Sequence, residues 1–174
     1  MLKNHFDREN LLRKLILKKL AENTNATIVE FGREEERKED YYVFLETVPD
    51  QLNRLHCLEY TVFIFGQFST SLNHGGSLRA KFNYAIPKEE HAKEYYTNEM
   101  KICDIVMKTN YENKGYGSIL MSHYLQYCTK NKVKRIWGIF SKVDEKGDNE
   151  ARRNHFYKKH GFEIAGREIE KILY

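Results

Sequence analysis

Leucine and isoleucine recur at helical spacing near the N-terminus, between lysine and arginine residues. This pattern predicts an amphipathic helix over residues 7–22, with Asp7 as the residue that caps its start. Stretches rich in valine, isoleucine, aromatic residues and threonine follow, and they predict strands at residues 26–31, 41–46, 58–68 and 77–86. We expect residues 69–76 to form a hairpin tip and the charge run at residues 34–40 to be a solvated loop.

From residue 98 onward, strand and helix patterns alternate. They predict a strand, a helix, a strand, a helix and two short strands at residues 100–108, 117–129, 133–140, 149–160, 162–165 and 169–173. In the first of these helices the apolar side chains share one face, formed by Leu120, Met121, Tyr124, Leu125 and Cys128. Gly161 stands where the second helix needs a left-handed cap, and Phe162 can fold back on that helix. The pattern therefore predicts helices packed on a sheet, in an α/β fold.

Composition and length indicate one globular domain. The chain has 174 residues, of which 41% are hydrophobic and 13% aromatic, and we expect a single domain over residues 1–174. No apolar run approaches the roughly 18 to 20 residues that a membrane-spanning helix needs, so we expect no membrane contact. The N-terminal residues show no apolar signal core, which predicts a cytoplasmic protein.

Cysteine and histidine spacing gives no indication of a metal site. Cys57, Cys103 and Cys128 are an odd number without a CxxC pair, and we expect reduced thiols, the last two in the core. His155 and His160 are five residues apart, which is not the i, i+4 spacing of two metal ligands on a helix. We therefore expect no metal.

The charge is uneven along the chain. Formal net charge is +4, but residues 130–159 contain 10 Lys and Arg against 4 Asp and Glu. Such a stretch attracts phosphates, on a cofactor or on a nucleic acid. Nucleic-acid binding would weaken steeply with salt. Because acidic residues interrupt the stretch, we rank nucleic acid last among the partners.

A glycine-containing turn joins the strand at residues 100–108 to the next helix. In the segment Glu112 to Ser118, Gly115 and Gly117 let the backbone approach a ligand closely. Free N–H groups at a helix start favour an anion, so this turn is suited to a pyrophosphate. It is no Walker A loop, which needs Gly-Lys-Ser/Thr, and no dinucleotide GxGxxG, since position 120 is Leu120.

This turn resembles the signature of the GNAT superfamily of acyl-CoA-dependent N-acyltransferases, Gln/Arg-x-x-Gly-x-Gly/Ala, here residues 112–117. A second similar element, an aromatic-Tyr pair followed by Gly-Phe, lies at residues 156–162. The resemblance covers about residues 98–165 and departs at Glu112, where the family has Gln or Arg. It implies a mixed, mostly antiparallel central sheet, flanked by helices and splayed at the strand that the family counts as its fourth.

The resemblance also implies acetyl-CoA as co-substrate and a set of residues that hold it. Main-chain amides of the turn would bind the pyrophosphate, at Asn113, Lys114, Gly115, Tyr116, Gly117 and Ser118. Ile105 and Met107 would offer backbone groups to the pantetheine arm, and an amide at Ile105 or Val106 would polarise the thioester carbonyl. Asn149 would contact the same arm, and the Lys114 side chain would contact a phosphate.

For the chemistry, the resemblance implies direct attack of a neutral amine on the thioester in a ternary complex. Tyr157 would protonate the leaving thiolate. The amine must lose a proton, and Asp104 and Glu99 are the carboxylates best placed to take it, unless an ordered water chain does so. The alternative is a non-catalytic acyl-CoA-binding regulatory module, which Glu112 favours. The acceptor, an amine on a small molecule, peptide or protein, stays open, as does a homodimer.

Overall fold

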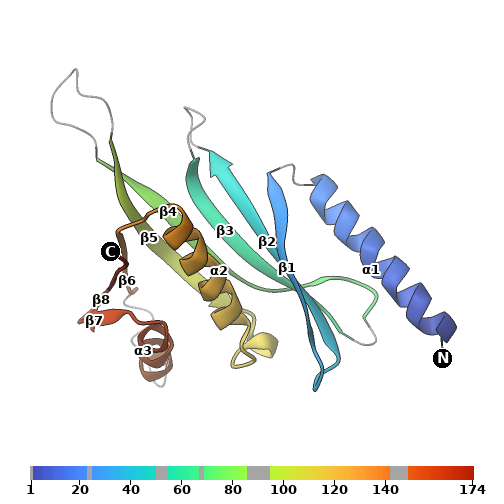
Figure 1. Ribbon diagram of the computed structural model, residues 1–174. Helices are drawn as coiled ribbons and strands as arrows, with labels where there is room; N and C mark the ends of the chain where they lie inside the picture. The colour runs from blue at the N-terminus through green and yellow to red at the C-terminus, as the bar shows by residue number, and fades with distance from the viewer. Residues whose placement is uncertain (1, 23–24, 50–54, 67–68, 86–94, 142–148) are drawn as a thin grey trace.

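The computed structural model describes residues 2–22, 25–49, 55–66, 69–85, 95–141 and 149–174 (Figure 1). In chain order its elements are α1 (Leu2–Glu22), β1 (Ala26–Glu34), β2 (Glu39–Pro49), β3 (Leu55–Phe65), β4 (Asn73–Ala85), β5 (Tyr95–Met107), the 3-10 helix η1 (Thr109–Tyr111), α2 (Tyr116–Lys130), β6 (Arg135–Ile139), α3 (Asn149–Lys159), β7 (Glu163–Ala165) and β8 (Glu168–Ile172). No helix among these residues is both long and apolar enough to cross a bilayer.

The strands form one sheet of eight in the order β1-β2-β3-β4-β5-β6-β8-β7. Every neighbouring pair is antiparallel except β5 and β6, which are parallel. This confirms the mixed, mostly antiparallel sheet and the N-terminal helix. The strand that the family counts as its fourth is β5 here, because β1 to β4 all precede it.

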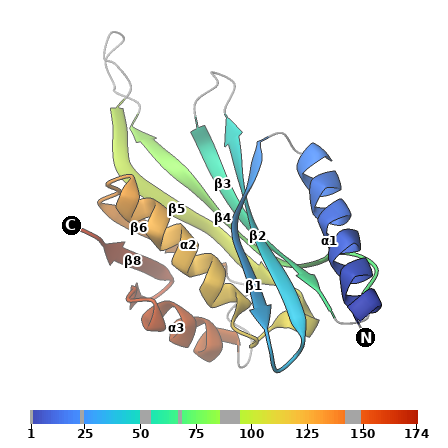
Figure 2. The same cartoon turned by 45° about the vertical axis from the view of Figure 1, so that its right-hand side comes forward.

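One helix covers the middle of the sheet and builds the core. The buried face of α2 consists of Tyr116, Leu120, Met121, Tyr124 and Cys128, which confirms the predicted apolar stripe. It packs on β3, β4 and β5 (Figure 2). In these strands Leu58, Val62, Leu78, Met100 and Ile102 are almost fully buried. At roughly 1.5 to 3 kcal/mol for each large apolar side chain, this burial holds the start of α2 firmly against β5.

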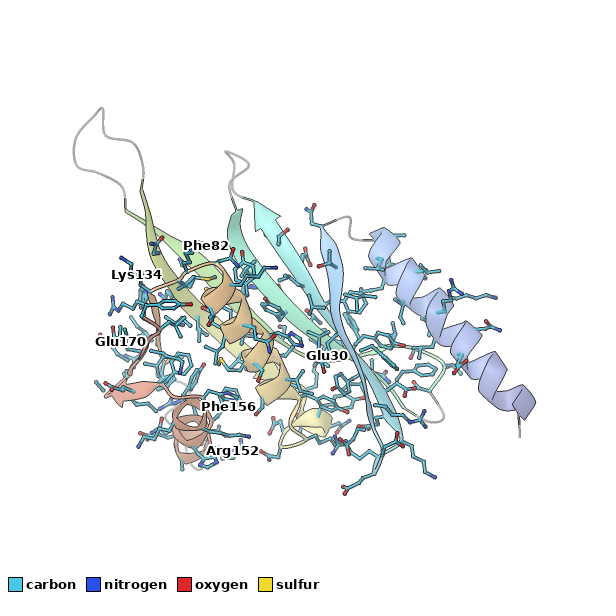
Figure 3. All side chains as sticks on the ribbon, viewed as in Figure 1. Glu30, Phe82, Lys134, Arg152, Phe156 and Glu170 are labelled. Carbon is cyan, nitrogen blue, oxygen red and sulfur yellow. The ribbon has the colours of Figure 1, made fainter. Side chains whose placement is uncertain are left out.

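The sheet edge at β1 is tied to α2 by side chains. Glu30 of β1 is labelled in Figure 3. Its carboxylate lies 2.5 Å from His123 Nε2 of α2 and accepts a hydrogen bond from the Tyr41 hydroxyl at 2.7 Å. Burial and this bond raise the pKa of Tyr41 to about 12. On the opposite face of the sheet at this edge, α1 lies beside β1 and β2, and its Leu12 side chain is buried.

Two sequence predictions about local structure are wrong, and a third holds only in part. Asp7 is not a cap, because α1 begins at Leu2. The segment 69–76 is not a hairpin tip throughout, because β4 begins at Asn73. The charge run at 34–40 is a solvated loop only in its middle: residues 35–38 form a largely exposed turn, whereas Glu34 ends β1 and Asp40, only 2% exposed, belongs to β2.

The sheet opens between β5 and β6. Their pairing ends at Ile102 opposite Gly138, whereas β5 continues to Met107 and stays paired with β4. Cys103 is the extra residue of a register shift between β4 and β5, and such a bulge increases the local twist. Residues 103–107 therefore have no partner on the β6 side among the described strands, which confirms the predicted splay.

Candidate active site

The glycine turn has the backbone geometry expected of an anion site. Asn113 and Gly115 have φ values of 58° and 87°, and Gly115 directly precedes the first residue of α2. A side chain on Gly115 would meet nothing within 4 Å, so the positive φ, and not crowding, calls for glycine there. The first N–H groups of a helix have no partner within it, so those of Tyr116 and Gly117 remain available to a ligand.

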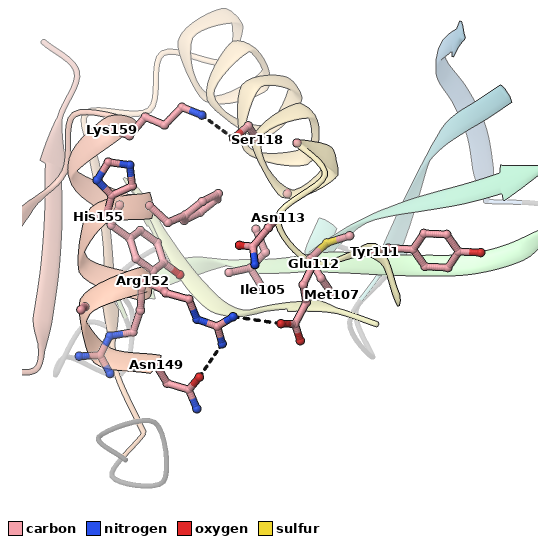
Figure 4. A pocket seen from close by; sticks show the side chains of 16 residues that line it. Ile105, Met107, Tyr111, Glu112, Asn113, Ser118, Asn149, Arg152, His155 and Lys159 are labelled. Atoms are coloured by element: carbon pink, nitrogen blue, oxygen red, sulfur yellow. Dashed lines mark hydrogen bonds and ion pairs between the residues drawn. The ribbon is translucent and has the colours of Figure 1, made fainter. Parts of the chain in front are cut away.

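A cavity of about 810 Å³ lies between this turn, the unpaired end of β5 and one face of α3 (Figure 4). Its lining includes Ile105, Met107, Tyr111, Glu112, Asn113, Gly115, Gly117, Ser118, Asn149, Arg152, His155, Phe156, Tyr157 and Lys159. The cavity thus brings together segments that are up to 54 residues apart in the chain, from Ile105 to Lys159.

The backbone at Gly117 lies close to the cavity's apolar wall. A Cβ atom at Gly117 would lie 3.5 Å from the Phe156 ring, 3.8 Å from Met107 Cγ and 3.9 Å from Ile105 Cδ1. These are ordinary van der Waals distances, so one methyl group fits but a large side chain would fill the cavity. The wall formed by these three residues is apolar and suits the carbon chain of an extended ligand.

The C-terminal cap of α3 places Tyr157. Gly161 has a φ of 77°, its N–H donates to the Lys158 carbonyl, and the Phe162 N–H donates to the Tyr157 carbonyl. These two bonds make a Schellman motif and confirm the predicted left-handed cap. The Phe162 ring folds back to 5.4 Å from the Tyr157 ring, which Phe140 also contacts at 5.4 Å. Tyr157 is only 5% exposed, so these rings hold it in one orientation at the cavity.

Glu112, the departure from the family signature, is paired across the cavity. Its carboxylate accepts a hydrogen bond from Arg152 Nη1 at 3.2 Å, and Arg152 Nη2 donates to Asn149 Oδ1 at 2.6 Å (Figure 4). A guanidinium therefore faces the acidic side chain where the family has Gln or Arg. The negative charge near the turn is thereby offset, and Asn149 is held at the start of α3.

Of the residues expected at the site, Ile105, Met107, Asn113, Gly115, Gly117, Ser118, Asn149 and Tyr157 line the cavity. Val106, which alternates with its neighbours along β5, is 54% exposed and does not line it.

Two residues of the turn point their side chains elsewhere. Lys114 Nζ lies 3.6 Å from Glu39 Oε1, and the Tyr116 hydroxyl donates to Glu39 Oε2 at 2.8 Å. Burial and this hydrogen bond raise the pKa of Tyr116 to about 12. Neither side chain lines the cavity, so the expected contact of the Lys114 ammonium with a phosphate does not fit this geometry.

The two candidate carboxylate bases also lie outside the cavity lining. Asp104 is exposed on β5 opposite Arg79 of β4, and Glu99 lies 3.6 Å from Arg135 Nη1. Cys103, expected in the core, is exposed at the bulge, whereas Cys128 is buried as expected. Burial raises the pKa of the Cys128 thiol to about 12, which leaves it protonated and inert. Among the described residues no group of three or more His, Cys, Asp or Glu could hold a metal ion.

Sequence reasoning missed the polar residues that α3 contributes to the cavity: Arg152, His155 and Lys159. Together with Asn149 and Phe156 they recur at spacings of three and four along this helix. That periodicity, on a helix with little apolar character, was the available signal.

A parallel strand pair that splits beside a glycine turn at a helix start is the arrangement that the signature resemblance implies. The chain belongs to the acetyltransferase (GNAT) family, because the sequence model of that family matches residues 33–162. No curated protein matches the chain in sequence.

Solved structures of that family are similar to the chain. The paia N-acetyltransferase of Thermoplasma acidophilum, solved with coenzyme A, shares 17% identity and a TM-score of 0.46 over 68% of this chain. The chain covers 62% of that protein, less than two thirds of its length. The IAA acetyltransferase of Bacillus cereus shares 13% identity and a TM-score of 0.47, over 68% of this chain and 79% of that one.

Proposed function

We propose that this chain is an N-acetyltransferase that moves an acetyl group from acetyl-CoA to a primary amine by direct attack in a ternary complex. The observation that carries the proposal is the cavity in which the glycine turn, the unpaired edge of β5 and the Tyr157 side chain meet. Each of the three supplies one requirement of the reaction: an anion site, a groove for an extended arm and a proton donor.

The donor would bind along the three segments in order. Amides at the start of α2 would hold the pyrophosphate. The arm would follow β5 as an added strand, because residues 103–107 offer backbone groups that no described strand uses on that side. Ile105 and Met107 of this edge line the cavity, and Asn149 of α3 lines it as well. An amide at Ile105 or Val106 would polarise the thioester carbonyl.

Tyr157 would act as the general acid. The amine nitrogen attacks the carbonyl carbon, the carbon–sulfur bond breaks, and the departing sulfur takes a proton from the Tyr157 hydroxyl. The proton lost by the amine goes to Asp104 or Glu99, or to a water chain leading to one of them. Both carboxylates stand apart from the cavity lining, which favours the route through water.

The competing function is a non-catalytic acyl-CoA-binding module. Its main support was the negative charge of Glu112 beside the expected phosphates. Since Arg152 pairs with Glu112, that charge gives no reason for lost turnover. An experiment can separate the two functions, because the non-catalytic module would bind acetyl-CoA without cleaving its thioester.

A thiol-release assay against a panel of amines, peptides and aminoacyl compounds tests the proposal. We expect free thiol to appear with at least one acceptor class, and an equal amount of acetylated amine by mass spectrometry. Tight binding of acetyl-CoA without thiol release by any acceptor would instead support the regulatory module.

A further inference from the structure

Two basic side chains, one from the last residue of α3 and one from the residue that follows it, converge on one hydroxyl at the start of α2. Lys159 Nζ donates to Ser118 Oγ at 3.3 Å, and His160 Nε2 lies 3.3 Å from the same oxygen. Figure 4 shows Lys159 and Ser118 facing each other across one end of the cavity, away from the pair of Glu112 and Arg152. The Ser118 N–H is already used, because it donates to the Gly115 carbonyl at 2.9 Å.

Lys159 is a cation at this end that has no carboxylate partner among the described residues. Glu112 is the one acidic side chain among the described residues of the lining, and Arg152 pairs with it. No carboxylate of the described chain lies within ion-pair distance of Lys159, whose ammonium bonds to a neutral hydroxyl instead. Burial lowers the pKa of His160, with Lys159 and Lys171 adding to the effect, so the ring is neutral at pH 7.

A lysine ammonium, a serine hydroxyl and an imidazole are the donors that a phosphate group uses. The glycine turn already accounts for the pyrophosphate of the proposed donor. Coenzyme A carries one more phosphate, the monoester on the 3′ carbon of the ribose whose 5′ carbon bears the pyrophosphate. That group has to lie near the turn, and Ser118 is three residues from Gly115.

We propose that Ser118 and Lys159, with His160 beside them, form a phosphomonoester subsite that takes the 3′-phosphate of the coenzyme A donor. The proposal rests on the proposed function, since it names a second anchor for the same ligand. In this proposal, side chains outside the glycine signature let the protein distinguish coenzyme A from its 3′-dephospho form.

The test compares calorimetric binding of coenzyme A and 3′-dephospho-coenzyme A to the full chain at low salt. We expect the wild type to favour coenzyme A about tenfold, the ratio that one charge-assisted hydrogen bond supplies. Lys159→Met should reduce the ratio to about one by weakening coenzyme A alone, and Ser118→Ala should reduce it partly. Lys158→Met is the matched control, because Lys158 is exposed and outside the lining, and its ratio should stay at the wild-type value.

The outcomes separate this subsite from the function on which it rests. If the wild type binds both ligands equally, or if Lys159→Met weakens both by the same factor, the subsite is overturned while the proposed function stands. If the wild type binds neither ligand, the proposed function fails and the subsite fails with it.

Discussion

Arg152 joins the two walls of the cavity through two nitrogens of one guanidinium. Nη1 bonds to Glu112, which precedes the glycine turn, and Nη2 bonds to Asn149 at the start of α3. The side chains of Arg152 and Glu112 are 50% and 37% exposed, so water and salt screen their attraction. The pair matters less for stability than for the electrostatic potential that a bound phosphate experiences.

This pair gives a prediction about acetyl-CoA affinity. Arg152→Met leaves the Glu112 charge uncompensated beside the turn, and we expect binding to weaken about three- to tenfold at low salt. Adding Glu112→Gln should restore most of the affinity, because it removes the repelling charge. Calorimetry on the two single variants and the double variant measures the coupling. A double variant as weak as Arg152→Met would mean that Arg152 binds the ligand itself.

Gly117 gives a prediction in which the size of the side chain decides the result. Gly117→Ala adds a methyl group at ordinary contact distance from Phe156 and should change acetyl-CoA affinity by no more than about threefold. Gly117→Trp should fill the cavity next to the turn and weaken binding by at least about 100-fold. Far-ultraviolet circular dichroism must show both variants folded. Normal binding by the folded Trp variant would show that the ligand lies elsewhere.

Local sequence signals predicted the parts of the site that neighbouring residues build. The cap at Gly161 follows from a glycine after a helix with Phe162 behind it, and the turn at Gly115 follows from its place between strand and helix. The cap and the turn both depend on contacts between residues that are only a few positions apart in the chain. That is why the cap and the turn could be anticipated from local sequence, whereas the expected roles of the amides and of Tyr157 came from the resemblance to the family signature.

Contacts between distant segments could not be predicted in the same way. Lys114 meets Glu39 from 75 residues away, and Arg152 meets Glu112 from 40 residues away. Such pairs depend on strand register and on where a bulge falls. Cys103 is exposed for the same reason, because a one-residue shift between β4 and β5 changes the side of the sheet that it faces.

The cap of α3 gives a prediction about stability. Gly161 has a φ of 77°, and a side chain there costs about 1 to 2 kcal/mol, so Gly161→Ala should lower the free energy of unfolding by that amount. Gly66→Ala is the control, since nothing lies within 4 Å of its Cβ and its φ is not positive, and it should change stability by less than about 0.5 kcal/mol. Urea unfolding measures both. Equal losses would contradict the role of the cap.

Two histidines give a prediction about pH. Burial lowers the pKa of His74 and of His160, with nearby lysines adding to both effects. The unfolded chain therefore takes up protons near about pH 6.5 that the folded chain does not bind. The free energy of unfolding should fall as the pH drops below about 6.5, and His160→Gln should flatten this dependence. Urea titrations over that range measure the slope, and an unchanged slope in the variant would contradict the assignment.

Tyr157 gives the prediction on which the chemistry depends. Tyr157→Phe keeps the ring that packs on Phe140 and Phe162 and removes the hydroxyl, so folding and acetyl-CoA affinity should be preserved. Loss of a general acid should lower kcat by about 10² to 10⁴ while KM for acetyl-CoA changes little. Tyr127→Phe, on the far half of α2 beside Phe82, is the control and should keep wild-type turnover. If Tyr157→Phe turns over at the wild-type rate, the leaving thiolate takes its proton from another donor, and His155 in the same lining becomes the next residue to change.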